Sequence, residues 1–152
     1  MNVSQTGQIL LFDLAKYFEA LSSQIDPFIK DGQPVVLTVE DVVICFAYSP
    51  MRDCFFLVTE ISDAIATRDN ILEAFIESRE LAFRRTRVAI EPSTKSFVLV
   101  RDFFASNTRD IEALRIVEEF VKDAAPLKPL FEEVPSIPLS ATVERDDSWI
   151  KV

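Results

Sequence analysis

The sequence predicts an α+β fold, a two-layer sandwich in which helices pack on a twisted antiparallel sheet. Segments rich in Val, Ile and Phe alternate with apolar residues at helical spacing, in the order α-β-β-β-α-β-β-α. The joints inside each group of strands are short, whereas parallel strands need crossovers of about a dozen residues or more. With 152 residues, 49% of them apolar and only 2 glycines, the chain is expected to form one ordered domain over residues 1–134.

Three predicted strands, residues 42–48, 54–58 and 97–100, carry apolar side chains on both faces. A strand with one face in water alternates apolar and polar residues, because successive side chains point to opposite sides. In the first of these strands, one face carries Val42, Ile44, Phe46 and Tyr48, and the other carries Val43, Cys45 and Ala47. One layer of helices covers only one face, so we expect a second subunit or a bound polypeptide to cover the other.

The first half of the chain is predicted to form a helix followed by a meander. Residues 8–25 place apolar side chains at steps of three and four, which predicts one amphipathic helix: Leu11, Leu14, Ala15, Phe18, Leu21 and Ile25. Pro27 and the pair Asp31-Gly32 are expected to end this segment and turn the chain. Residues 35–40, 42–48 and 54–61 then read as three strands joined by short polar turns.

A second helix is predicted over residues 68–81, with Thr67 as its N-cap. Its apolar stripe packs on the sheet or is shared with a partner: Ile71, Leu72, Phe75 and Ile76. Two further strands follow at 87–90 and 96–105, joined by a turn of polar residues.

Asn107 is expected to cap the last helix, whose apolar stripe runs as far as Ala124. Pro126 and Pro129 are expected to kink or end this helix, because proline lacks the backbone N–H that a helix interior needs. Residues 135–152 are rich in Pro, Ser, Thr and charge, and they are predicted to form a flexible C-terminal tail.

The net charge of −9 disfavours nucleic acids and anionic membrane surfaces as partners, since both attract an excess of Lys and Arg. The basic cluster Arg84-Arg85-x-Arg87 is the local exception, and two interpretations remain open for it. The arginines solvate an edge strand and pair with nearby acids, or they dock an acidic partner.

Missing residue types argue against an enzyme. The chain has no histidine, and Gly7 and Gly32 alone cannot build a phosphate-binding loop. Two cysteines are too few for a structural zinc site, so we expect no catalytic residues, no cofactor and no metal. Cys45 and Cys54 are expected to be buried thiols; a cross-strand disulfide is the alternative if the turn between the strands centres on residues 49–50.

No stretch approaches the ~20 apolar residues that span a bilayer, and we expect no membrane insertion. The apolar run near the N-terminus has no basic flank and is interrupted by Asp13 and Lys16, unlike a signal peptide. These features indicate a cytoplasmic protein.

The order of elements resembles the class I type III secretion effector chaperones of Gram-negative bacteria, the family that includes the Tir chaperone. The resemblance covers residues 8–133, and the opening amphipathic helix is part of it. It also rests on the meander DGQPVVLTVEDVVICFAYSPMRDCFFLV, the strand pair RVAIEPSTKSFVLVRDFF and the closing stretch IEALRIVEEFVKDAAPLKPLFEEV. The tail and the unusually apolar first helix depart from the family pattern.

The resemblance implies a bacterial homodimer without enzymatic activity, which binds an N-proximal segment of a secreted effector in extended form. Such a chaperone keeps its effector soluble and presents it to the secretion ATPase. By position, the resemblance places effector contacts on the first helix and the meander: Leu11, Leu14, Phe18, Val35, Leu37, Ile44, Phe46 and Phe55. It places the dimer interface at Ile71, Leu72, Phe75, Ile76, Val88 and Ile90.

Plain core packing is the alternative for each of these residues. At the level of function, a multi-effector export-control protein of the same fold is not separated from a single-effector chaperone. A regulatory adaptor that binds a folded partner is the alternative from another class, and a small carboxylate-based enzyme is the third.

Overall fold

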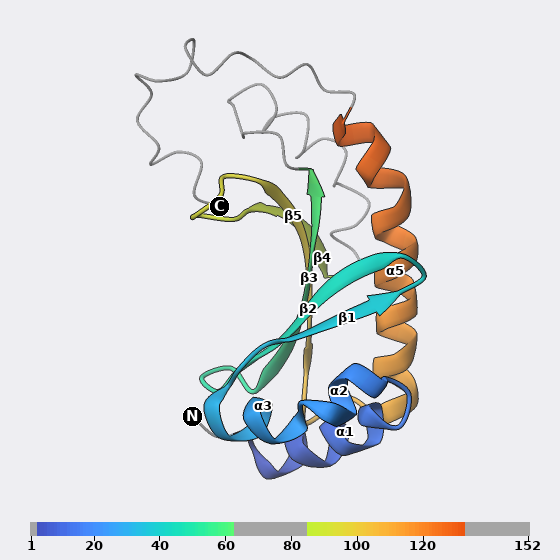
Figure 1. Ribbon diagram of the computed structural model, residues 1–152. Helices are drawn as coiled ribbons and strands as arrows, with labels where there is room; N and C mark the ends of the chain where they lie inside the picture. Colours follow the sequence, from blue (N-terminus) through green and yellow to red (C-terminus); the bar gives the residue numbers. More distant parts are fainter. Residues whose placement is uncertain (1–2, 63–84, 133–152) are drawn as a thin grey trace.

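A computed structural model describes residues 3–62 and 85–132 (Figure 1). Three short helices precede the sheet and one long helix follows it: α1 (Gln5–Ala15), α2 (Glu19–Ser23), α3 (Ile25–Asp31) and α5 (Asp110–Glu132). The strands are β1 (Val35–Val39), β2 (Val42–Ser49), β3 (Cys54–Ser62), β4 (Thr86–Ile90) and β5 (Phe97–Phe104). The predicted second helix and the predicted tail lie outside the described residues.

The five strands form one antiparallel sheet in the order β1-β2-β3-β5-β4, which confirms the predicted meander and the predicted strand pair. Glu40 and Asp41 join β1 to β2 with φ angles of 49° and 67°, the left-handed pair typical of a two-residue hairpin. Figure 1 shows the strong twist of the sheet, with β1 and β2 crossing the direction of β3 and β5.

The helices pack on one face of this sheet, here called the core face. Figure 1 shows α5 running beside the sheet and α1–α3 gathered at one end of it. The core face carries aromatic rings that stack on one another: Phe46 lies 5.2 Å from Phe55 and 5.5 Å from Phe28 of α3, centroid to centroid. Arg101 also points to this side and pairs with Glu119 of α5, at 3.1 Å between Nη1 and Oε2. The two layers therefore share a dry aromatic core and a peripheral ion pair.

The N-terminal segment is three helices, not the single helix predicted for residues 8–25. The first helix ends at Ala15, and Phe18 takes an extended conformation, with φ −128° and ψ 107°. A straight 18-residue helix would be roughly 27 Å long. The break folds the chain back instead, so that Leu21 and Phe28 both enter the core. Burial of these side chains thus overrides a helical period that the sequence carries without interruption.

Prolines also behave differently from the prediction. Pro27 lies in the first turn of α3, where the missing N–H has no partner inside the helix, and the helix ends at Gly32 with a left-handed φ of 65°. The last helix begins at Asp110 rather than next to Asn107, and it continues through Pro126 and Pro129 to Glu132. Side chains on both sides of Pro126 pack on the core, and this packing keeps the helix continuous.

A hydrogen-bonded cluster ties the start of α1 to the turn between β2 and β3. The Ser4 hydroxyl caps α1 by accepting from the N–H of Gly7, and it donates to Asp53 Oδ1 over 2.6 Å. The Tyr48 hydroxyl donates to the same carboxylate oxygen and accepts from the Ser4 N–H. Asp53 therefore fixes the position of the helix relative to the sheet.

Candidate peptide-binding surface

The face of the sheet opposite the core, here called the outer face, is apolar but only partly covered. Val36 of β1 and Val43 of β2 are 57% and 53% exposed, although both are β-branched residues inside regular strands. Toward β5 the same face becomes buried, and Val98 and Val100 are almost inaccessible. The prediction that both faces are apolar is confirmed, and the free part of the outer face lies over β1 and β2.

The β1 strand lies at the edge of the sheet and pairs only with β2 among the residues that the structure describes. In a two-residue hairpin the residues that flank the turn form a hydrogen-bonded pair, here Val39 with Val42, and such pairs then alternate along the strands. It follows that the backbone N–H and C=O groups of Val36 and Thr38 point away from β2. These two residues offer hydrogen-bonding groups at the edge and side chains on the outer face.

The residues predicted to contact an effector lie mostly on the opposite face. Seven of the eight have side chains no more than 2% exposed: Leu11, Leu14, Val35, Leu37, Ile44, Phe46 and Phe55. The eighth, Phe18, is half-buried and packs against the same core. Side chains enclosed in this way offer little surface to a partner, so their burial favours the alternative of plain core packing. The predicted alternation of the strands is confirmed, and the helices cover the face on which these side chains lie.

The residues predicted for the dimer interface are placed only in part. Ile71, Leu72, Phe75 and Ile76 lie outside the described residues. Val88 and Ile90 belong to β4, the second edge strand, and both side chains turn toward the core, opposite Leu99 and Phe97. A contact made by β4 would therefore use its backbone edge, which has no neighbouring strand among the described residues.

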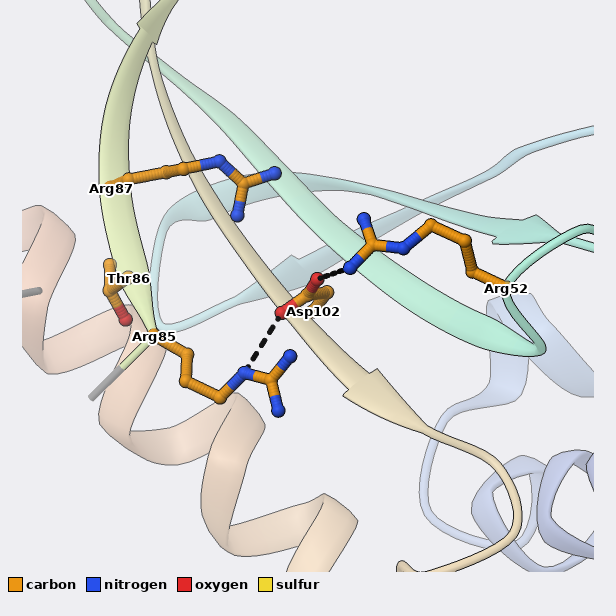
Figure 2. A pocket seen from close by; sticks show the side chains of 5 residues that line it. All are labelled: Arg52, Arg85, Thr86, Arg87 and Asp102. Carbon is orange, nitrogen blue, oxygen red and sulfur yellow. Dashed lines mark hydrogen bonds and ion pairs between the residues drawn. The ribbon is translucent and has the colours of Figure 1, made fainter. Parts of the chain in front are cut away.

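The basic cluster joins an acid on the outer face, as the first of its two interpretations predicts. Arg85 Nε lies 3.4 Å from Asp102 Oδ1, and Arg52 Nη2 lies 3.3 Å from Asp102 Oδ2. Asp102 is only 4% exposed, whereas both arginine side chains are half exposed. Figure 2 shows Arg87 reaching toward the same part of β5 from β4. Arg84 lies outside the described residues.

The two cysteines are free thiols and do not face each other. The turn covers residues 50–53, so Cys54 pairs with Ser49, while Cys45 pairs with Val58 four residues further on. That offset corresponds to about 13 Å along the strands, beyond the reach of about 7 Å for a disulfide. Burial raises the pKa of both thiols, and for Cys54 Arg52 opposes this effect. Neither cysteine is therefore an activated nucleophile.

Two absences hold within residues 3–62 and 85–132. Their His, Cys, Asp and Glu side chains form no group placed to bind a metal ion. None of their helices has the length and apolar character that a bilayer-crossing helix needs.

No sequence model of a protein family matches the chain, and no curated protein sequence matches it either. Solved structures do match. A chain of the ExsC–ExsE complex aligns with a TM-score of 0.63 and 11% identity, over 89% of this chain and 100% of that one. A chain of the HopA1–SchA chaperone–effector complex aligns with a TM-score of 0.58 and 9% identity, over 82% and 94%.

A third match is to the structure of the Yersinia pestis type III secretion chaperone SycH in complex with a stable fragment of YscM2. It has a TM-score of 0.55 and 13% identity, over 80% of this chain and 98% of that chain. Identities this low establish the architecture and nothing finer. The chain has the α+β fold of the type III secretion chaperones.

Proposed function

We propose that the chain is a type III secretion chaperone that holds a segment of one or more effector proteins in extended form. The observation that carries the proposal is the edge of β1, where backbone groups without a strand partner in residues 3–62 and 85–132 lie beside exposed apolar side chains. An extended polypeptide that adds to this edge gains backbone hydrogen bonds, and its alternate side chains contact the outer face. Two of the matched structures are complexes of a chaperone with an effector or with a protein fragment.

The contacts of this proposal differ from those expected from the sequence. The edge of β1 supplies the pairing, and Val36 and Val43 supply apolar contact. Ile9 and Phe12 on the solvent side of α1 are also more than half exposed, and they offer a further apolar surface. Coupled folding of the segment costs several kcal/mol in ordering, which a large buried area offsets.

The proposal includes a homodimer, because a bound segment covers only part of the apolar surface. The β4 edge is the counterpart of the β1 edge at the far side of the sheet. Sedimentation equilibrium measures this directly. A dimer has twice the chain mass of 17.3 kDa, and a strict monomer would contradict this part of the proposal. Delivery to the secretion ATPase, without ATP use by the chain itself, completes the proposed role.

The decisive variant is Thr38→Pro, with Thr38→Ala as its matched control. Proline at an edge position removes an outward N–H and leaves the β1–β2 ladder intact, whereas alanine removes the side chain and keeps that N–H. We expect Thr38→Pro to abolish co-purification of a co-expressed N-terminal segment from a protein encoded beside this chain's gene. Thr38→Ala should retain it.

Hydrogen exchange supplies the second readout. In the complex, the amides of Val36 and Thr38 should become protected, since they gain partners on the added strand. Equal binding by the proline and alanine variants, with no new protection in β1, would contradict strand addition at this edge. If the bound partner is folded, and if it resists protease also when this chain is absent, the adaptor alternative is favoured.

A further inference from the structure

An open pocket of about 370 Å³ lies on the outer face, at the end of the sheet where β4, β5 and the β2–β3 turn meet. Its lining is strongly basic and is here called the arginine pocket: Arg52, Arg85, Thr86, Arg87 and Asp102. Figure 2 shows Arg52 from the β2–β3 turn and Arg85 from the start of β4 directed at Asp102, while Arg87 extends from β4 across β5. The pocket therefore gathers charges from segments far apart in the sequence.

The positive charge in this pocket exceeds the negative charge. Asp102 accepts one N–H from Arg52 and pairs with Arg85 through its second oxygen, so it compensates one of three positive charges. Each guanidinium has five N–H donors, and those not aimed at Asp102 remain available. Arg87 is exposed, and no carboxylate among the described residues pairs with it. In a chain of net charge −9, this local excess is unusual.

Two of the three arginines, Arg52 and Arg85, are held in place before any ligand arrives. Arg52 lies over the ring of Phe56, with 5.9 Å from Cζ to the centroid, and Arg85 lies over Phe104 at 4.8 Å. Arg85 also takes a left-handed φ of 60°, a conformation that costs a non-glycine residue free energy and so requires compensation. Ring stacking and the buried carboxylate limit the rotation of both side chains, which lowers the entropy cost of binding an anion.

We propose that the arginine pocket binds the carboxylate of an aspartate or glutamate side chain in the extended polypeptide. The identity of that polypeptide rests on the proposed function; the chemistry of the pocket does not. Guanidinium groups match a carboxylate with paired N–H donors, and Phe56 and Phe104 offer apolar surface to the neighbouring peptide. A nucleic acid is disfavoured, because the chain has a net charge of −9 and would repel its continuous phosphate charge.

The probe is a blocked five-residue peptide with one central glutamate, and its control is the same peptide with glutamine. Titration of the whole chain is followed by NMR at the Nε–H signals of Arg52, Arg85 and Arg87. We expect saturable shifts with the glutamate peptide only, and these shifts should weaken as salt is added. Arg87→Glu should weaken binding about tenfold, because it replaces an attraction by a repulsion. Circular dichroism checks that the variant is folded.

Arg115→Glu is the matched control, since Arg115 is an exposed arginine of α5 and the change in net charge is identical. It should leave the affinity within about twofold, consistent with salt-screened, distant charges. Equal NMR shifts with the glutamate and glutamine peptides, or an equal loss of peptide affinity in Arg87→Glu and Arg115→Glu, would overturn the proposal. So would stronger binding of a single-stranded oligonucleotide, or an effect of Arg87→Glu on self-association alone. Because the probe needs no effector, failure here leaves the β1 test untouched, and the reverse also holds.

Discussion

The two faces of the sheet are built from the same strands and similar residue types, yet one is buried and the other is partly exposed. On the core face, Phe46 and Phe55 stack within a cluster that the helices seal from water. On the outer face, Val36 and Val43 remain more than half exposed, and charged side chains surround Asp102. The difference arises from the helices, because α2 and α5 contact the core face of the strands.

This difference teaches that apolar character alone does not define a core. An apolar residue stabilises the fold in proportion to the solvent-accessible area that folding removes from water. The exposed valines of β1 and β2 on the outer face keep more than half of that area. Exposed apolar surface lowers the solubility of a protein, and it commonly marks the binding site of a partner. Adjacent residues on one strand therefore serve as matched probes for stability and for binding.

The largest contrast is expected between Phe55 and Phe56, neighbours on β3. Phe55 is fully buried on the core face, whereas Phe56 lies half-buried on the outer face under Arg52. Phe55→Ala should cost about 3–5 kcal/mol in the free energy of unfolding, since it leaves a cavity. Phe56→Ala should cost less than half as much. Urea unfolding followed by circular dichroism measures both, and equal losses in the free energy of unfolding would contradict the difference in burial between the two faces.

A middle-sized effect is expected from Asp102, the buried charge of the outer face. Asp102→Ala removes the partner of two arginines, and we expect a loss of about 2 kcal/mol, limited because both arginines are half exposed to solvent. Asp102→Asn keeps a hydrogen-bond acceptor and should cost less. Thermal unfolding at low and high salt checks this, because the difference between the wild-type chain and the alanine variant should shrink as salt rises. A salt-independent loss would assign the effect to packing.

The smallest and sharpest comparison is between Val42 and Val43. Threonine has nearly the shape of valine, so the change tests burial of a hydroxyl with little change in volume. Val42→Thr should cost about 1–2 kcal/mol, because Val42 is buried on the core face. Val43→Thr should change stability by less than about 0.5 kcal/mol and weaken binding of the extended segment. Chemical denaturation gives the stabilities, and a larger loss at Val43 would show that the outer face is covered.

Much of the fold could be predicted from the sequence, and the strands were predicted best. All five lie within two residues of their predicted bounds, because β-branched and aromatic runs between polar turns leave few alternatives. The N-terminal helices were predicted less well, since Leu21 and Phe28 enter the core only if the chain breaks near Phe18. The disulfide alternative for Cys45 and Cys54 fails because the turn between β2 and β3 is longer than two residues, which moves the two cysteines out of register.

The sequence by itself determined the class of fold, the antiparallel meander and strand pair, and the presence of two apolar faces, because local propensity and side-chain alternation depend on near neighbours in the chain. Only the tertiary structure decided which face the helices cover, and so which residues remain for a partner. It also brought Arg52 and Arg85 to one carboxylate across the sheet and placed Arg87 in the same pocket. The physical reason is that burial and charge pairing depend on contacts between distant segments, which no local pattern encodes.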